Sequence, residues 1–178
     1  MPFRFKKSES PAKAVRRVCR ERIGAALGGL RQGDRPAAVH GVRKEIKKLR
    51  AIFRLVRGEI GRGVYRKGAK ALRQVADSLT ASRDARVMLK AFKKLVGRNA
   101  SQFAGIEKAL RKNTGREGER FRRDDSFKRA ERLLHKTERR VDDLKIKAAG
   151  WAAIEPGLKE SYRRGITIHW DPQKEAIV

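Results

Sequence analysis

The sequence predicts an all-α fold: an antiparallel bundle of about four to five long helices with basic faces, followed by a short extended C-terminal tail. Apolar residues recur at helical spacing through most of the chain, whereas a strand-like alternation occurs only near the C-terminus. The segments between the helical stretches are short, as in helix bundles. With 178 residues and an apolar share of 39%, the chain is long enough for one domain with a substantial core.

The first helix is expected to begin at Ser10-Pro11, because a hydroxyl N-cap followed by proline is a favoured helix start. Its apolar stripe contains Cys19, the only cysteine, which predicts a packing role and excludes an intrachain disulfide. We expect Gly28-Gly29 to fray or end this helix and residues 32–36 to form a turn.

The central helix is predicted to run to about Ile60, with Asp34 as its cap. At about 100° per residue, one side of it is apolar and the other is cationic. The cationic side carries His40, Arg43, Lys47, Arg50, Arg54 and Arg57.

The rest of the chain is divided by local breaks. We expect one at Gly61-Arg62-Gly63, another at Ser82-Arg83-Asp84 and a turn across residues 113–118. A last long helix should begin at residues 124–126. After an interruption at Pro156-Gly157 the chain has one or two helical turns, and residues 166–172 are expected to be extended because they are β-branched and end in proline.

Basic stripes recur outside the central helix. The candidates are Arg16 and Arg20 on the first helix, Lys70 and Arg73 on the third, Arg83, Lys90 and Lys93 on the fourth, and Arg132, His135 and Arg139 on the last long helix. The chain has 47 Lys and Arg against 20 acids, a formal net charge of +27. Such an excess indicates a polyanionic partner: nucleic acid, polyphosphate or an anionic membrane.

Three stretches are similar to landmarks of the CHAD family, the conserved-histidine α-helical domain. Residues 39–50, VHGVRKEIKKLR, resemble its first signature, residues 79–89 resemble a second with an Arg-Asp pair, and residues 151–165 resemble a third. The resemblance implies an antiparallel helical fold with a basic channel that binds inorganic polyphosphate. By position, His40, Arg43, Lys47 and Arg50 match the binding face, and Arg83 matches the Arg-Asp landmark.

The resemblance also implies a domain division. Residues 1–165 correspond to the first half of the usual fold, and residues 166–178 form an atypical tail. Arg86 stands where the family usually has an acid. Pairing with a second copy to complete the fold, and association with polyphosphate granules, are left open.

Composition and spacing favour binding over catalysis. The three histidines, His40, His135 and His169, show no metal-ligand spacing, and no acidic cluster suits Mg²⁺, so we expect neither metal nor cofactor. His40 is best interpreted as a hydrogen-bond donor to phosphate. Nucleic-acid binding is the alternative, although aromatic residues are only 6% of the chain and no helix-turn-helix motif is recognisable. The sequence has no bilayer-spanning apolar run or secretory signal, which favours a cytoplasmic location and no membrane partner.

Overall fold

The computed structural model describes residues 4–6, 8–32, 36–123 and 126–169, and within these ranges it contains helices and no strand. The all-α prediction is confirmed. The α-helices are α1 (Pro11–Arg31), α2 (Pro36–Leu55), α3 (Arg57–Ser78), α4 (Thr80–Val96), α5 (Ala104–Arg123), α6 (Ser126–Asp142) and α7 (Glu155–His169). Two 3₁₀ segments, η1 (Gly97–Phe103) and η2 (Gly150–Ala153), accompany them.

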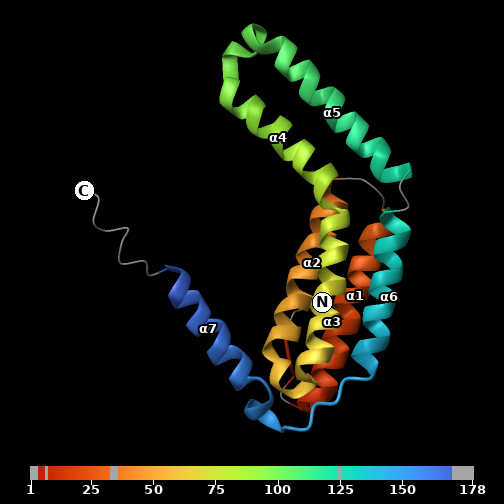
Figure 1. The fold of residues 1–178 in the computed structure, drawn as a ribbon, viewed down its shortest axis with the longest axis vertical. Coiled ribbons are helices and arrows are strands. Elements are labelled where there is room, and N and C mark those ends of the chain that lie inside the picture. Colours follow the sequence, from red (N-terminus) through yellow and green to blue (C-terminus); the bar gives the residue numbers. More distant parts are fainter. Residues whose placement is uncertain (1–3, 7, 33–35, 124–125, 170–178) are drawn as a thin grey trace, which may run out of the picture.

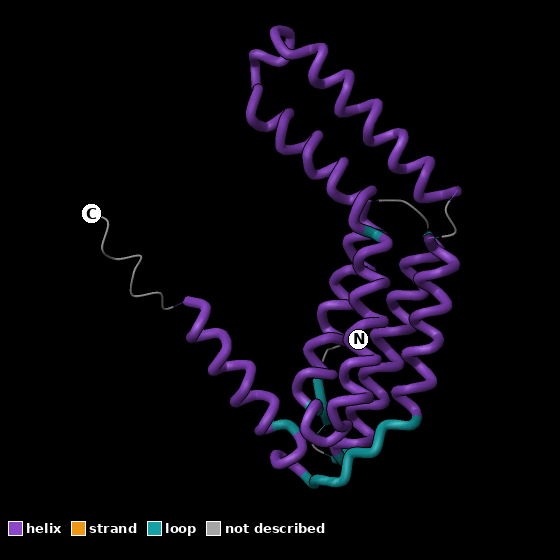
Figure 2. The backbone as a smooth tube through the Cα atoms, viewed as in Figure 1, coloured by secondary structure: helices purple, strands orange, loops and turns teal. Residues whose placement is uncertain are grey.

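Four helices form the bundle. α1 packs on α2 and α6, and α3 packs on the same two helices, so the four make a closed ring. The contact between α2 and α3 therefore lies on the opposite side of the ring from the contact between α1 and α6. The α4–α5 hairpin extends from one end of the bundle, and α7 diverges from the other end (Figure 1). Figure 2 shows that the longest described loop, between α6 and η2, crosses beneath the bundle.

The apolar stripes meet in one core at the centre of the ring. Ile23 of α1, Leu49 and Phe53 of α2, Leu72 of α3 and Leu134 of α6 are all almost completely buried. Burying each of these side chains contributes about 1.5–3 kcal/mol relative to exposure. Cys19 is 0% exposed in the same core, where burial raises the pKa of its thiol to about 12.

The first helix begins as expected and ends later than expected. Ser10 Oγ accepts a hydrogen bond from the Lys13 backbone N–H at 3.4 Å. The prediction that Gly28-Gly29 ends the helix is wrong, because α1 continues to Arg31. A Cβ on Gly29 would lie 2.7 Å from Val42 Cγ2, so this glycine allows α1 and α2 to approach closely. The expected cap, Asp34, lies outside the described residues.

Two breaks fall at different positions from those predicted. α2 ends at Leu55 and not at Ile60, and after one intervening residue, Val56, α3 begins at Arg57. Gly61 does interrupt the helical geometry, with φ +72°, but α3 resumes after this kink. The next break is at Leu79 and not at residues 82–84, since the turn there leads directly into α4.

The later glycines and the tail also differ from expectation. The predicted turn at residues 113–118 lies inside α5, where Thr114 Oγ1 donates to Leu110 O at 2.9 Å and is 3.3 Å from Ala85 O of α4. α7 contains Pro156 and Gly157 and continues through Ile166–His169, so the extended conformation expected there is wrong. Once a helix has been nucleated, each added residue gains a backbone hydrogen bond, and β-branching lowers helix propensity only slightly. Residues 170–178 of the predicted tail lie outside the described part of the chain.

Candidate functional site

The basic stripe of α2 follows one flank of that helix. His40, Lys47 and Arg54 are exposed, whereas Arg43 and Arg50 are half-buried. One turn separates successive members, which corresponds to about 5.4 Å along the helix axis. The flank is therefore a regular row of cations beside the core, as the sequence predicted.

Two contacts establish how α2 and α3 lie against each other. Arg43 Nη1 donates to Ala76 O at 3.0 Å and to Thr80 Oγ1 at 3.1 Å. Ten residues further along α2, the ring of Phe53 lies against Gly68. In this antiparallel register, Lys47 is about level with Arg73, and Arg54 is about level with Arg66.

The α3 flank next to Arg43 carries its own cations. Ala76, which accepts the hydrogen bond from Arg43, lies on this flank. Helical spacing places Arg62, Arg66 and Arg73 on the same side of α3, and Lys70 lies further from α2 around the helix. All four side chains are exposed. We call the outer side of the contact between α2 and α3, with its two rows of cations, the α2–α3 seam. Its cations are His40, Arg43, Lys47, Arg50 and Arg54 of α2 and Arg62, Arg66, Lys70 and Arg73 of α3.

Arg62 and Arg66 were absent from the residues predicted as a site. Arg66 follows Arg62 by four residues, and Arg73 follows Arg66 by seven. These spacings place all three on one helix face, so the sequence contained a signal that could have identified Arg62 and Arg66. The break expected at residues 61–63 concealed the relation between Arg62 and the rest of the helix.

Most cations of the α2–α3 seam are not neutralised by the protein. Within the described part of the chain, Lys47, Arg50, Arg54, Arg66 and Arg73 take part in no side-chain hydrogen bond or ion pair. The single acid of α2, Glu45, lies on the other flank. There Arg22 Nη1 of α1 approaches Glu45 Oε2 at 3.2 Å, and Lys48 Nζ approaches Glu45 Oε1 at 2.7 Å.

One end of the α2–α3 seam adjoins α7. Arg57, the last member of the predicted stripe, is half-buried, and its Nη1 lies 3.7 Å from Glu160 Oε1. Glu160 also accepts from Arg164 Nε at 2.7 Å and from Arg163. The hydrogen bond from Arg164, together with the charge and hydrogen bond of Arg163, outweighs desolvation by burial and holds the pKa of Glu160 below its ordinary value. Arg57 is therefore already paired with an internal carboxylate.

The candidates on α1 lie on the opposite side of the ring. Arg16 Nη2 donates to Leu144 O at 2.6 Å, and Arg20 Nη2 lies 2.7 Å from Asp142 Oδ1. Both arginines tie α1 to the end of α6. The structure thus separates them from the α2–α3 seam and gives them a packing role.

The remaining candidates do not reach the α2–α3 seam either. Arg132, His135 and Arg139 are exposed on the outer face of α6, diagonal to α2 in the ring, with His135 Nδ1 3.2 Å from Glu138 Oε2. Lys90 and Lys93 lie on the projecting hairpin, and Lys93 Nζ is 3.6 Å from Glu107 Oε1. Arg83 is in α4, but its side chain is outside the described part of the structure.

The described ranges contain neither a metal cluster nor a membrane-spanning helix. No group of three or more His, Cys, Asp or Glu side chains is placed there to hold a metal ion. None of the helices described is both long and apolar enough to cross a bilayer.

Comparison with known proteins gives one match. No curated protein and no solved structure matches the chain. A protein-family model described as the CHAD domain matches residues 14–174. Because this match covers most of the 178 residues, the chain belongs to the CHAD domain family.

Proposed function

We propose that the α2–α3 seam binds inorganic polyphosphate and that the protein is a binding module without catalytic activity. The CHAD domain family is associated with polyphosphate binding. The observation that carries the proposal here is the register between α2 and α3, which sets two rows of unneutralised cations side by side.

The two rows suit a polymer whose only recognisable groups are phosphate oxygens. Arginine presents a planar fork to two oxygens of one phosphate, and lysine supplies a mobile point charge. Repetition of these groups at each helical turn lets successive phosphates find equivalent partners along the seam. When cations of the protein neutralise phosphates, the counterions condensed on the polyanion are released, so the affinity should fall steeply with salt, as for nucleic acids.

The proposal assigns no bond-breaking step to this surface. Phosphoryl transfer depends on metal ions or positioned cations together with a base that orients the nucleophile. Glu45 is held by Arg22 and Lys48 on the flank that faces α1, so it is not placed to serve as that base. Incubation with long-chain polyphosphate and Mg²⁺, followed by assay of released phosphate, tests this point; sustained release would contradict it.

A matched pair of variants tests the binding site. The first replaces Lys47 and Arg54 with alanine, and the second replaces Arg132 and Arg139 on the outer face of α6. Both variants remove two exposed cations. We expect the first to weaken binding of long-chain polyphosphate about tenfold near physiological salt, since each exposed ionic contact contributes up to about 1 kcal/mol. The second should change the affinity less than about twofold on the same reasoning. Equal losses would mean that binding depends on net charge and not on the seam.

Competition separates polyphosphate from nucleic acid as the polyanion. The protein is bound to immobilised long-chain polyphosphate and challenged with duplex DNA or single-stranded RNA at equal phosphate concentration. Retention on polyphosphate supports the proposal. Ready displacement by either nucleic acid would overturn it in favour of a nucleic-acid-binding protein.

A further inference from the structure

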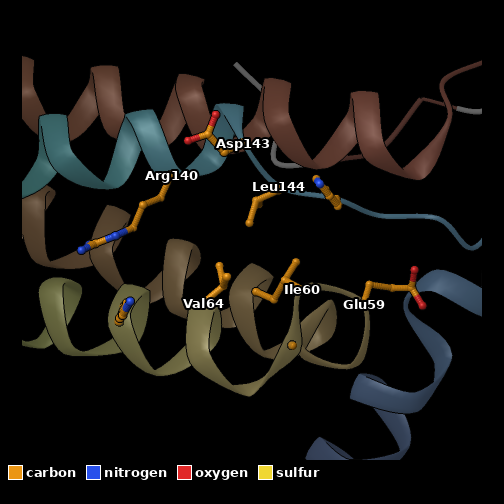
Figure 3. A pocket seen from close by; sticks show the side chains of 9 residues that line it. Glu59, Ile60, Val64, Arg140, Asp143 and Leu144 are labelled. Atoms are coloured by element: carbon orange, nitrogen blue, oxygen red, sulfur yellow. The ribbon is translucent and has the colours of Figure 1, made fainter.

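A pocket lies on a different side of the bundle, between α3 and the end of α6. Its volume is about 550 Å³, within the range of small-molecule sites. Ile60, Val64 and Leu144 form an apolar part of the lining, and Lys67, Arg140 and Lys145 add three cations. Figure 3 shows Leu144 opposite Ile60 and Val64, with Arg140 at one end of this apolar group.

The walls of this pocket are held in place by the surrounding chain. The kink at Gly61, with φ +72°, interrupts α3 where the pocket begins. At the same end, Glu59 Oε2 accepts hydrogen bonds from the backbone N–H groups of Lys147 and Ala148, each at 2.9 Å. These bonds attach the segment after α6 to the start of α3 and so hold two walls of the pocket together at this end.

Arg140 lines the pocket and also has a donor nitrogen without a partner among the described residues. Its Nη1 is buried from solvent and makes no hydrogen bond within the described part of the chain. A buried donor without a partner is unfavourable, so this nitrogen requires an acceptor that the described part of the chain does not supply. One of the two acids in the lining, Asp143, directs its carboxylate away from Ile60 and Val64 (Figure 3).

We propose that this pocket binds a small organic anion with an apolar body, such as a carboxylate or phosphate monoester on an aromatic or aliphatic group. The anionic group would be bound by Arg140 and Lys67, and the apolar body would lie against Ile60, Val64 and Leu144. This site is separate from the α2–α3 seam, because Val64 and Lys67 lie on the flank of α3 that faces α6. The proposal is therefore independent of polyphosphate binding.

The probe for this site is 8-anilinonaphthalene-1-sulfonate, an anion with an aromatic body that fluoresces when its surroundings become apolar. N-phenyl-1-naphthylamine, a related neutral dye, serves as the comparison. We expect saturable binding of the sulfonate at one site, weakened about tenfold in Arg140→Gln by loss of a charge-assisted hydrogen bond. Arg139→Gln removes the neighbouring exposed cation and should leave binding unchanged. Binding of the neutral dye should be insensitive to Arg140→Gln.

A second variant keeps the test decisive if Arg140→Gln alters the fold. Val64 is 39% exposed at the pocket, so Val64→Trp should fill the site while leaving the core intact. Far-UV circular dichroism establishes that each variant is folded. The proposal is overturned if Arg139→Gln and Arg140→Gln have equal effects, if Val64→Trp leaves sulfonate binding unchanged, or if polyphosphate competes with the sulfonate as it would at a shared surface.

Discussion

Gly68 of α3 lies directly against the ring of Phe53 of α2: a Cβ on Gly68 would be only 2.3 Å from Phe53 Cε1. Both residues are buried. The missing side chain allows the two helices to come close enough for Arg43 to reach Ala76 O and Thr80. A contact inside the core therefore establishes the register of the cations on the α2–α3 seam.

Gly68→Ala should destabilise the protein by about 1–3 kcal/mol, the usual effect of overpacking a core. The Phe53 ring would have to shift within its close-packed surroundings to admit the methyl group. The measurement is the free energy of unfolding in urea. Gly63→Ala, in the same helix, is the matched control: a Cβ there meets nothing within 4 Å. It should stabilise α3 by about 0.5–1 kcal/mol, and a similar gain from Gly68→Ala would contradict the close approach.

Arg43→Lys should lower stability by about 1 kcal/mol although it preserves the charge. Arg43 Nη1 donates to both Ala76 O and Thr80 Oγ1, and the ammonium of lysine ends one bond short of that position. Thermal or urea unfolding measures the loss. The same exchange at Arg54, which is exposed and makes no side-chain bond in the described part of the chain, should leave stability unchanged. If the two variants are equally stable, the Arg43 contacts do not contribute to the packing of α3 on α2.

Gly157→Ala should detach α7 from the bundle. A Cβ at Gly157 would lie 2.0 Å from Leu55 O, and a backbone atom at the end of α2 cannot move aside as a side chain can. Hydrogen exchange in α7 and its cleavage by protease should accelerate, while the unfolding midpoint of the four-helix ring changes little. Gly165→Ala, where a Cβ meets nothing within 4 Å, should do neither. Unchanged exchange in Gly157→Ala would show that α7 is not held by this contact.

Glu59 should make stability depend on pH in the acidic range. Hydrogen bonds from the backbone N–H groups of Ala148 and Lys147 hold the pKa of its carboxyl below the ordinary value, despite some desolvation. Because the pKa of Glu59 is lower in the folded state than in the unfolded state, its ionised form stabilises the fold. This stabilisation is fully present at pH values above the unfolded-state pKa and is lost as the pH falls through the folded-state pKa. Glu59→Gln should therefore be less stable than the parent at pH 7, and the difference should shrink as the pH falls below the ordinary pKa of a glutamate and through the lowered folded-state pKa. A pH-independent difference would contradict it.

The basic stripe of α2 could be predicted from sequence because it follows from local geometry. Once Ile46, Leu49 and Phe53 are buried, helical spacing places Lys47 and Arg54 on a flank whatever the partner helix. Which other stripe would lie beside it depends on the order of helices around the ring, which no local pattern contains. Arg16 and Arg20 resembled the other candidates in sequence, but the position of α1 sets them against Leu144 and Asp142.

Glycine was the main source of error in predicting the breaks. In a local pattern a glycine indicates a turn, yet Gly29 and Gly157 lie within helices where another chain segment approaches too closely for a side chain. Gly61 alone among these three adopts a positive φ and kinks its helix. The difference is decided by neighbours distant in sequence, so a single sequence does not reveal which role a glycine plays.

The complete burial of Cys19 makes the only thiol of the chain a chemical reporter of its folding. Alkylating reagents attack the thiolate, and a thiol with a pKa near 12 and 0% exposure offers almost none while the bundle is closed. The labelling rate should therefore follow the fraction of molecules that open. Any polyanion that binds only the closed form should slow the alkylation of Cys19. The alkylation rate would therefore report polyanion binding at a surface distant from the thiol.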